Sequence, residues 1–417
     1  MLAVVVTGVV GVLAALLLVV RTIAIVRCFR VHPPHALVRS GSESASAERP
    51  QQQRQKNEFG KPQSNSTLVT GQVAGSGVSI LKPLKGADLH LRSNLETFVR
   101  QAVQQANVEV LFCLETADDP AAQVVEDLLN EYPTARARCF TLPRRRGVNP
   151  KINNLYEAFE SATYDTIWIS DANLRTSDAH FTLTLTEFAS VGQHGVLHQP
   201  PLTVYRNGFA AAIEEAYFST QHCYLYAFAD AMRINGFNGM SILLSRQLFK
   251  TRCGDLTAFS DFLAEDFFMS QALYAAGCRH RMSNAPAMQN AAPRQPYQLF
   301  LRLVRWQRLR QGSMWAASYL ELLAEAWTSC VLLTLVVSPW AGLLFWLVAQ
   351  AQDMLLQHHL TNLFERPPTA IAQQIVANWT REVHYLATAN KAYLSEMTLF
   401  TLPAVAARCN SVYGCAL

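Results

Sequence analysis

Five short apolar segments, each rich in β-branched or aromatic residues, follow one another between residues 78 and 200 of this 417-residue chain. They read "VSILK", "VEVLFCLE", "ARCFTL", "TIWISD" and "HGVLH". Segments with helical spacing, such as "PAAQVVEDLLNEY" and "KINNLYEAFESA", lie between most of them. Strands that alternate with helices form parallel sheets covered by helices. The pattern therefore predicts an α/β fold with a Rossmann-type parallel sheet up to about residue 200.

Two further elements are expected after this sheet. The segment "GFAAAIEEAYFSTQHCYLYAFADAM" (208–232) has the pattern of one long helix. The segment "GFNGMSILLSRQLF" (236–249) has the pattern of a strand that glycine introduces and a turn follows.

The first apolar run of the chain has the length of a membrane span. Residues 2–20 read "LAVVVTGVVGVLAALLLVV", with no charge, and four arginines follow at Arg21, Arg27, Arg30 and Arg39. A cleaved signal peptide, the alternative, begins with basic residues and ends in a small-residue cleavage site. No basic residue precedes this run, so we expect a retained transmembrane anchor over residues 1–26. The positive-inside rule places the chain after Arg21 in the cytosol.

Composition supports a membrane protein and excludes other classes. Half of the residues are hydrophobic and 16% are charged, against about 25% charged in a soluble domain. A formal charge of +4 is too small to indicate nucleic-acid binding. The nine cysteines form no CxxC pair, which favours reduced thiols over disulfides or a zinc site.

The C-terminal part contains a second long apolar stretch. Residues 326–352 contain no charged residue and are interrupted by Ser338-Pro339. The stretch fits either one kinked spanning helix or a shallow re-entrant hairpin, and the sequence does not choose. The later apolar segments, 371–377 and 383–406, are polar enough for interfacial or bundle-buried helices.

Three acidic sites are candidates for a functional site. Asp118-Asp119 follows one predicted strand, Asp171 ends another, and Glu265-Asp266 lies among Phe and Leu. Ligands of open parallel sheets bind outside the carboxyl ends of the strands. Each site has a structural alternative: a helix cap at Asp119, a turn at Asp171, and a solvated helix face at Glu265-Asp266.

Together the three sites suit nucleotide chemistry. Carboxylates at two strand ends suit Mg²⁺ or Mn²⁺ with a nucleotide, because the cation takes one or two carboxylates plus phosphate oxygens. A third carboxylate in an apolar setting has a raised pKa, which suits a general base. Between them lies "RRRGVNPKINNL", in which Lys151 at a helix start is placed to face a diphosphate; a solvated loop is the alternative.

The run "YQLFLRLVRWQRLRQGSMW" has the pattern of a basic amphipathic helix near residues 295–315. Such a helix lies at a membrane interface.

In chain order these pieces resemble the ceramide glucosyltransferase family, which has a GT-A-like fold and a D, D, D, (Q/R)xxRW set of functional residues. The resemblance extends from "SILKPLKG" (79–86) to "RLVRW" (302–306), more than half of the chain. Within it "LKPLKG", "DDPA", "NPKINNL", "AEDFFM" and "AMQN" are similar to the family's own sequence.

The resemblance implies a role for each matched residue. Asp266 would be the catalytic base, with Arg302, Arg305 and Trp306 closing over the diphosphate and acceptor, and Arg308 and Arg310 left to lipid headgroups. Asp119 and Asp171 would serve the nucleotide-sugar and its metal. The remaining candidates are Lys82, Asp118 and Lys151 for the donor and His222 for the acceptor. Ala172 and Asn173, in "SDAN", offer no second metal carboxylate, and the tail after about residue 350 matches the family poorly.

The implied activity is an inverting transfer of glucose from UDP-glucose to the primary hydroxyl of ceramide, giving β-glucosylceramide at the cytosolic membrane face. The implied cofactor is Mg²⁺ or Mn²⁺, the implied partners are UDP-glucose, ceramide and the bilayer, without nucleic acid, and the implied compartment is the Golgi apparatus or endoplasmic reticulum. The alternatives are a processive polysaccharide synthase, a polyprenyl-phosphate sugar transferase and a membrane-anchored nucleotide-binding scaffold. The expected domains are an anchor (1–26), a flexible linker (27–76), a catalytic domain (77–315) and a membrane-associated C-terminal region (316–417).

Overall fold

The computed structural model describes part of the chain: residues 2–29, 77–141, 144–192, 195–204, 208–291, 296–314, 318, 321, 325–362, 374–383 and 387. Residues 30–76 of the predicted linker lie outside these described residues, as do residues 388–417 of the predicted C-terminal region.

A seven-stranded sheet forms the centre of the region predicted to be the catalytic domain, with strand order β3-β2-β1-β4-β8-β6-β9. The five predicted strands are all present, and β1 to β4 pair in parallel, which confirms the α/β fold class. One strand is reversed, because β8 pairs antiparallel with both β4 and β6. The sheet is therefore mixed rather than wholly parallel. Its strands are β1 (Val78–Pro83), β2 (Val108–Leu114), β3 (Ala137–Thr141), β4 (Thr166–Ser170), β6 (Gly195–His198), β8 (Ser241–Ser245) and β9 (Arg279–Met282).

Both faces of the central strands are buried, because alternate residues point to opposite sides and a layer of helices covers each side. On β4, Trp168 packs with one layer of helices, while Ile167 and Ile169 pack with the other. The first layer contains α2 (Leu91–Gln104), α3 (Pro120–Glu131) and α5 (Asp178–Val191). The second contains α4 (Pro150–Ser161), α8 (Arg246–Cys253), the short helix η1 (Leu256–Phe259) and α9 (Glu265–Ala275). The turn expected after β8 is the helix α8.

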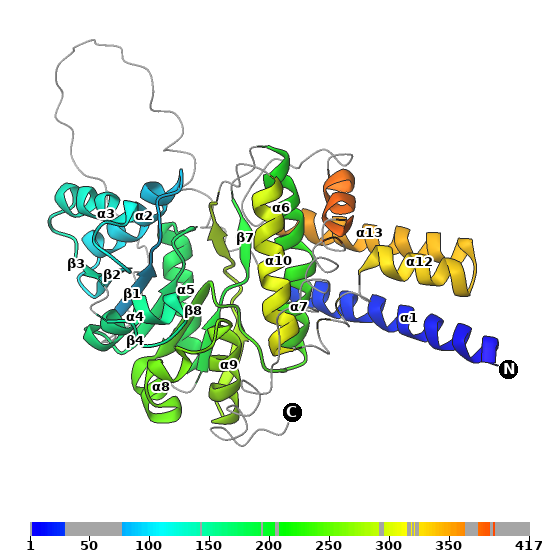
Figure 1. The fold of residues 1–417 in the computed structure, drawn as a ribbon, viewed down its shortest axis with the longest axis horizontal. Helices are drawn as coiled ribbons and strands as arrows, with labels where there is room; N and C mark the ends of the chain where they lie inside the picture. The colour runs from blue at the N-terminus through cyan, green and yellow to red at the C-terminus, as the bar shows by residue number, and fades with distance from the viewer. Residues whose placement is uncertain are drawn as a thin grey trace, which may run out of the picture.

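A smaller sheet and a group of helices adjoin the large sheet (Figure 1). The small sheet has the order β5-β10-β7 and is made of β5 (Leu174–Arg175), β10 (Ala287–Gln289) and β7 (Pro201–Thr203). The single helix expected over 208–232 is two helices, α6 (Phe209–Ser219) and α7 (Gln221–Ala231). The break falls at Thr220, whose φ of −123° and ψ of −93° are not helical. The basic helix is α10 (Pro296–Ser313), close to its expected bounds.

Three apolar helices project together from this group, away from the large sheet (Figure 1). The first is α1 (Leu2–Phe29), which continues three residues beyond the expected end of the anchor at 26. Within the described residues, Val6–Phe29 is the one segment that is long and apolar enough to cross a membrane.

The other two apolar helices, α12 (Ala326–Val336) and α13 (Pro339–Asn362), form a hairpin around Ser338-Pro339 (Figure 1). Gly342 permits their close approach, because an added Cβ would lie 2.6 Å from the carbonyl oxygen of Cys330. Of the two alternatives for residues 326–352, the structure has the hairpin. The 11 residues of α12 span about 16 Å, roughly half of a hydrocarbon core of about 30 Å.

Candidate active site

Asp119 follows β2 and begins α3 as its N-cap, so the predicted helix cap is confirmed. Its Oδ1 accepts a hydrogen bond from the Ala121 backbone N–H at 2.8 Å. Both carboxylate oxygens also accept from the N–H of Gly86, at 2.8 and 3.1 Å. Gly86 has a φ of +68°, which favours glycine. The end of "LKPLKG" is thereby fixed to the end of β2. The neighbouring Asp118 is exposed, and a hydrogen bond from Thr116 lowers its pKa.

Lys82 lies inside the molecule at the end of β1 and is fully buried. Its ammonium donates to the Ser170 hydroxyl at 3.0 Å and to the carbonyls of Asp171 and Leu174 at 2.8 and 3.3 Å. Burial lowers the pKa of Lys82 to about 7, although the charge of Asp171 opposes this shift. All three donors of the ammonium are occupied. Lys82 therefore holds the turn that carries Asp171, and its predicted contact with the donor stays a prediction.

Lys151 brings together two of the acidic sites. Its Nζ lies 3.0 Å from Asp171 Oδ1 and 3.3 Å from Glu265 Oε1, and it donates to the Gly239 carbonyl at 2.8 Å. Burial opposes the charge of this lysine, but the carboxylates of Asp171, Glu265 and Asp266 raise its pKa above the ordinary value. Lys151 thus partly neutralises a group of three carboxylates.

The motif "NPKINNL" places Lys151 through its first residue. The Asn149 side chain caps α4 by accepting from the backbone N–H groups of Lys151 and Ile152. Its Nδ2 also donates to Glu265 Oε2 at 2.9 Å. Pro150 occupies the first turn, where its fixed φ suits a helix start. A single asparagine therefore sets both Lys151 and the carboxylate that Lys151 contacts.

Asp266 lies in the first turn of α9, next to the phenylalanines that singled it out in the sequence. Its Oδ1 accepts from the N–H of Phe267 at 2.9 Å and its Oδ2 from the N–H of Gly239 at 3.1 Å. Burial and the neighbouring Glu265 charge raise the pKa of Asp266 to about 6, and Lys151 and the two N–H groups restrain that rise. A carboxyl group with this pKa is ionised near neutral pH and can still accept a proton.

Gly239 is needed for this position of Asp266. A Cβ added to Gly239 would lie 2.6 Å from Asp266 Oδ2. We expect Gly239→Ala to displace the carboxyl group and to lower the rate of the activity that the sequence predicts on the order of 100-fold, because small misplacements of reacting groups have effects of that size. Initial rates at saturating substrate would measure the change. Gly312→Ala on α10 is the matched control, because nothing lies within 4 Å of the added Cβ. Equal rates for both variants would contradict the assigned geometry.

Arg302 of α10 is held by a buried carboxylate that the sequence analysis did not single out. Its Nη1 donates to Glu214 Oε1 at 2.6 Å, and its guanidinium lies 4.6 Å from the ring centre of Trp306. Glu214 is 1% exposed and also accepts from Gln289 Nε2 at 3.0 Å. Burial raises the pKa of Glu214, and Arg302 opposes the shift. Gln289 belongs to "AMQN", so this motif supports the arginine motif through Glu214.

Trp306 and His222 lie in one aromatic cluster, with their ring centres 6.3 Å apart. Tyr217, Phe218 and Tyr226 complete the cluster around His222. His222 is buried, its Nδ1 has no hydrogen-bond partner among the described residues, and burial lowers its pKa well below the ordinary value. A neutral imidazole therefore lies beside the tryptophan of the arginine motif.

The remaining arginines of α10 differ in position. Arg305 is exposed. Arg310, which the sequence analysis leaves to lipid headgroups, points inward instead. It pairs with Glu321 at 2.7 Å and donates to the Tyr217 hydroxyl at 3.1 Å. The correction follows from helix geometry, because the direction of a residue depends on how the whole helix packs.

The carboxylate group and the aromatic cluster adjoin each other. Burial, followed by the charge of Asp266, raises the pKa of Tyr226, whose ring lies 4.9 Å from that of His222. Tyr226 thus links the two groups, because the charge of Asp266 acts on its hydroxyl and its ring packs against His222 of the cluster that contains Trp306. Asp119 instead contacts the backbone of Gly86 and Ala121, and Asp118 contacts Thr116.

A divalent cation fits this site only together with a donor phosphate. Within the described residues no group of three or more His, Cys, Asp or Glu side chains is arranged to hold a metal ion. Magnesium in nucleotide sites takes one or two carboxylates and completes its shell with phosphate oxygens and water. The Asp171 side chain is 29% exposed and supplies one such carboxylate. The carboxylate oxygens of this site are therefore suitable ligands for a divalent cation that also binds phosphate, with Asp119 as the second candidate ligand.

Four residues of the site were missed at the sequence level: Asn149, Glu214, Gly239 and Gln289. Two of them, Asn149 and Gln289, lie inside the quoted motifs "NPKINNL" and "AMQN". Glu214 is an acidic residue among apolar ones, which is the pattern that singled out Glu265-Asp266. Gly239 has no local signal beyond its place before a strand.

The fold and the site geometry together define a class of protein. An α/β sheet with carboxylates and a lysine at its strand ends, next to a helix with the R-x-x-R-W spacing, is the arrangement of a glycosyltransferase. The chain belongs to glycosyl transferase family 21, whose family model matches residues 51–398.

Curated relatives have been named for their activity. Ceramide glucosyltransferase 1 of Caenorhabditis elegans is 33% identical over 253 residues, which cover 61% of this chain and 54% of the worm protein. Ceramide glucosyltransferase 3 of the same organism is 32% identical over 267 residues, which cover 64% of this chain and 58% of that protein. The matches thus span a little over half the length of these relatives.

Among solved structures, the chain has a TM-score of 0.49 and 14% identity with the mannosyltransferase PcManGT from Pyrobaculum calidifontis, in complex with GDP-Man and Mn²⁺. That match covers 93% of this chain and 99% of the mannosyltransferase.

Proposed function

We propose that this protein transfers glucose from UDP-glucose to the primary hydroxyl of ceramide, with inversion to a β-glucoside. The observation that carries the proposal is the position of Asp266, whose charge interacts with Lys151 of the Lys151–Asp171 pair and with Tyr226, a member of the aromatic cluster around His222 and Trp306. A base between a polar group and an aromatic group suits a charged sugar donor and a lipid acceptor. The relatives named ceramide glucosyltransferase support the choice of substrates.

Asp266 acts as the base in this proposal. With a pKa of about 6 it is ionised at neutral pH, and it takes the proton of the acceptor hydroxyl as the oxygen attacks the anomeric carbon. The attack comes from the face opposite UDP, which gives inversion. The N–H of Gly239 holds the carboxylate in place at 3.1 Å. Base assistance of this kind typically contributes about 10²- to 10⁴-fold to the rate.

The leaving diphosphate gains negative charge, and cationic side chains stabilise it. Lys151 at the start of α4 supplies one positive charge. Arg302 and Arg305 supply forked donors that suit phosphate oxygens, and Glu214 sets the orientation of Arg302. When bound, a Mg²⁺ or Mn²⁺ ion held through Asp171, with Asp119 after β2 on the far side of β1, would add charge neutralisation at the diphosphate.

The proposed acceptor is a membrane lipid, so the site has to open at a bilayer surface. We place α1 across the membrane and the catalytic domain (77–315) on its cytosolic face, in the Golgi apparatus or the endoplasmic reticulum. The residues after 316 form the membrane-associated region in this arrangement. Exposed apolar side chains on the hairpin helices support it, with Leu335 and Trp340 each 78% exposed.

The test is an incubation of the membrane-bound protein with radiolabelled UDP-glucose and either ceramide or polyprenyl phosphate, followed by lipid extraction. Labelled glucosylceramide is the expected product. Labelled polyprenyl-phosphate glucose or an insoluble polymer would identify one of the alternative transferases, and the absence of any product would contradict the proposal.

A further inference from the structure

Thr220, at the break between α6 and α7, contacts a residue far away in the sequence. Thr220 is fully buried, and its hydroxyl accepts a hydrogen bond from Arg381 Nη1 at 2.7 Å while it donates to the Ala216 carbonyl. The contact spans 161 residues and comes from the helical segment 374–383. The backbone at Thr220 is therefore fixed by a charged side chain from the C-terminal region.

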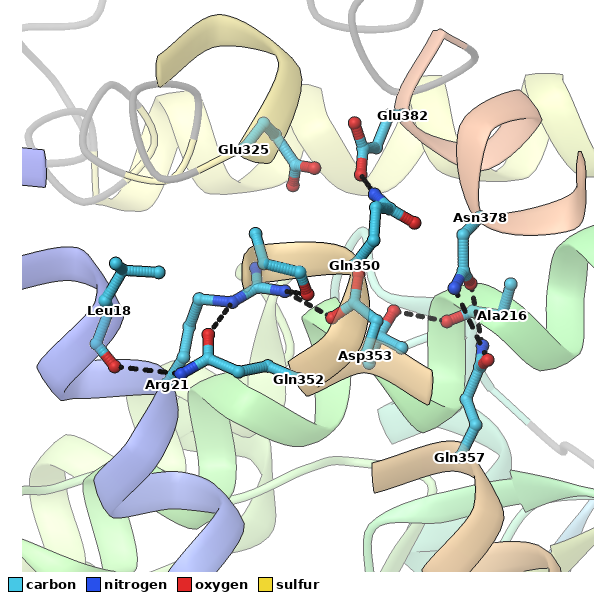
Figure 2. A network of polar contacts seen from close by, with 12 residues as sticks. Leu18, Arg21, Ala216, Glu325, Gln350, Gln352, Asp353, Gln357, Asn378 and Glu382 are labelled. Atoms are coloured by element: carbon cyan, nitrogen blue, oxygen red, sulfur yellow. Dashed lines mark hydrogen bonds and ion pairs between the residues drawn. The ribbon is translucent and has the colours of Figure 1, made fainter. Parts of the chain in front are cut away.

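Arg381 is in turn tied to the N-terminal helix through one carboxylate. Its Nη2 lies 3.5 Å from Asp353 Oδ2, and the other oxygen of Asp353 accepts from Arg21 Nη2. Asp353 is fully buried on α13, and Figure 2 shows Arg21 and Asp353 pointing toward one another. We call Arg21, Asp353 and Arg381 the arginine relay. It joins α1, α13 and the segment 374–383 to the α6–α7 break.

Additional contacts make the relay rigid. Arg21 also donates to the Ala349 carbonyl at 3.0 Å and lies over the ring of Tyr224, 4.6 Å from its centre. Glu382, labelled in Figure 2, lies 3.1 Å from Arg381 Nη2. Removal of one partner from a buried ion pair is strongly destabilising, because it leaves an unpaired charge in the interior.

The N-terminal helix also packs directly on α7. Ala24, Ile25 and Cys28 of α1 share a buried apolar cluster with Cys223, Tyr224 and Ala227 of α7. His222 immediately precedes these α7 residues and lies two residues after Thr220. The position of His222 against Trp306 therefore depends on contacts made by α1 and the C-terminal segment.

We propose that the arginine relay positions the acceptor side of the active site by fixing the α6–α7 break and, through it, His222. The N-terminal helix is then a structural part of the acceptor site in addition to being an anchor. The inference rests on the proposed function. It concerns the acceptor specifically, because Lys151, Asp171 and Asp266 belong to other elements.

The test compares Thr220→Val with Thr220→Ser in the full-length protein in lipid nanodiscs. Valine keeps the shape of threonine but offers Arg381 no oxygen, whereas serine keeps the hydroxyl. We expect Thr220→Val to raise the apparent KM for ceramide about tenfold, equivalent to about 1.4 kcal/mol. For Thr220→Val, the KM for UDP-glucose and kcat are expected to stay within about twofold of the wild-type values, since the lost Arg381 contact does not involve the donor residues. For Thr220→Ser, all three constants are expected to stay within the same range, because serine keeps the hydroxyl group.

A second variant tests the same relay from the other side. Arg381→Lys keeps the charge but lacks the fork that reaches Thr220 and Asp353 together, so it should raise the ceramide KM in the same way. If Thr220→Val yields little folded protein, the ceramide KM of Arg381→Lys tests the relay instead. Leu355→Ala, on an exposed position of α13 two residues after Asp353, is the matched control and should leave every constant unchanged.

The outcomes separate the two proposals. Wild-type protein that makes no labelled glucosylceramide would contradict the proposed function. Active wild-type protein with the same ceramide KM in Thr220→Val, Arg381→Lys and Thr220→Ser would overturn the relay. A parallel rise of the UDP-glucose KM would also overturn it, because the effect would then be a general loss of structure.

Discussion

Asp266→Asn is expected to lower the rate of sugar transfer by about 10²- to 10⁴-fold, the contribution usually made by a general base. Asparagine has nearly the same shape, and its single side-chain oxygen can still accept from one of the two N–H groups, that of Phe267 or that of Gly239. It cannot take a proton from the acceptor hydroxyl. Binding of UDP-glucose should survive, since Lys151 and Asp171 are unchanged. Single-turnover rates and equilibrium binding of UDP-glucose would measure the two effects separately.

The matched control for this variant is Asp261→Asn, an exposed carboxylate five residues earlier in the same segment. It should retain wild-type rates. Substantial turnover by Asp266→Asn, with donor binding intact, would refute the assignment of the base.

Lys151→Met is expected to remove the cation shared by Asp171 and Glu265 and to shift the pH dependence of the reaction. The base works only when it is ionised, so the wild-type rate should rise with pH through about 6, the pKa of Asp266. Lys151 lowers this pKa. Its removal should therefore move the rise to higher pH and reduce the rate at neutral pH. A pH–rate profile of each protein measures this shift.

The same change should lower the free energy of unfolding by about 2 kcal/mol, because partly buried carboxylates lose a charged hydrogen-bond partner. Lys250→Met is the control. Lys250 pairs with Glu160, but its side chain is 42% exposed, and such pairs contribute at most about 1 kcal/mol. An unchanged pH profile in Lys151→Met would show that Lys151 does not set the pKa of Asp266.

The strands were predictable because their signals are local. The segment "TIWISD", for example, is β4 with Asp171 directly after it. The direction of β8 was not predictable, because it depends on the path that the chain takes through α6 and α7 between β7 and β8. The reversal has a consequence for the site. It brings the residues that precede β8, Gly239 and Met240, to the edge where β4 ends, where the Met240 carbonyl accepts from the N–H of Asp171.

The site was predictable to the extent that its residues stand in recognisable motifs. Lys151, Asp171 and Asp266 were selected from the sequence, and the structure places them together. Their roles in catalysis remain predictions. The break at Thr220 could not be predicted, because its partner Arg381 is 161 residues away. The sequence therefore suggested one continuous helix. The direction of Arg310 was wrong for another reason, because it depends on how α10 packs against Tyr217 of α6.

The pairing of Arg21 with Asp353 also has a consequence for biosynthesis. The two residues are 332 positions apart in the chain. At a synthesis rate of about 5–20 residues per second, the ribosome needs roughly 20–60 seconds to produce Asp353 after Arg21. During that interval the arginine, in the last turns of an apolar helix, lacks its native carboxylate. Chains that end before residue 353 never acquire it, so truncated products should be recognised and degraded soon after they are released.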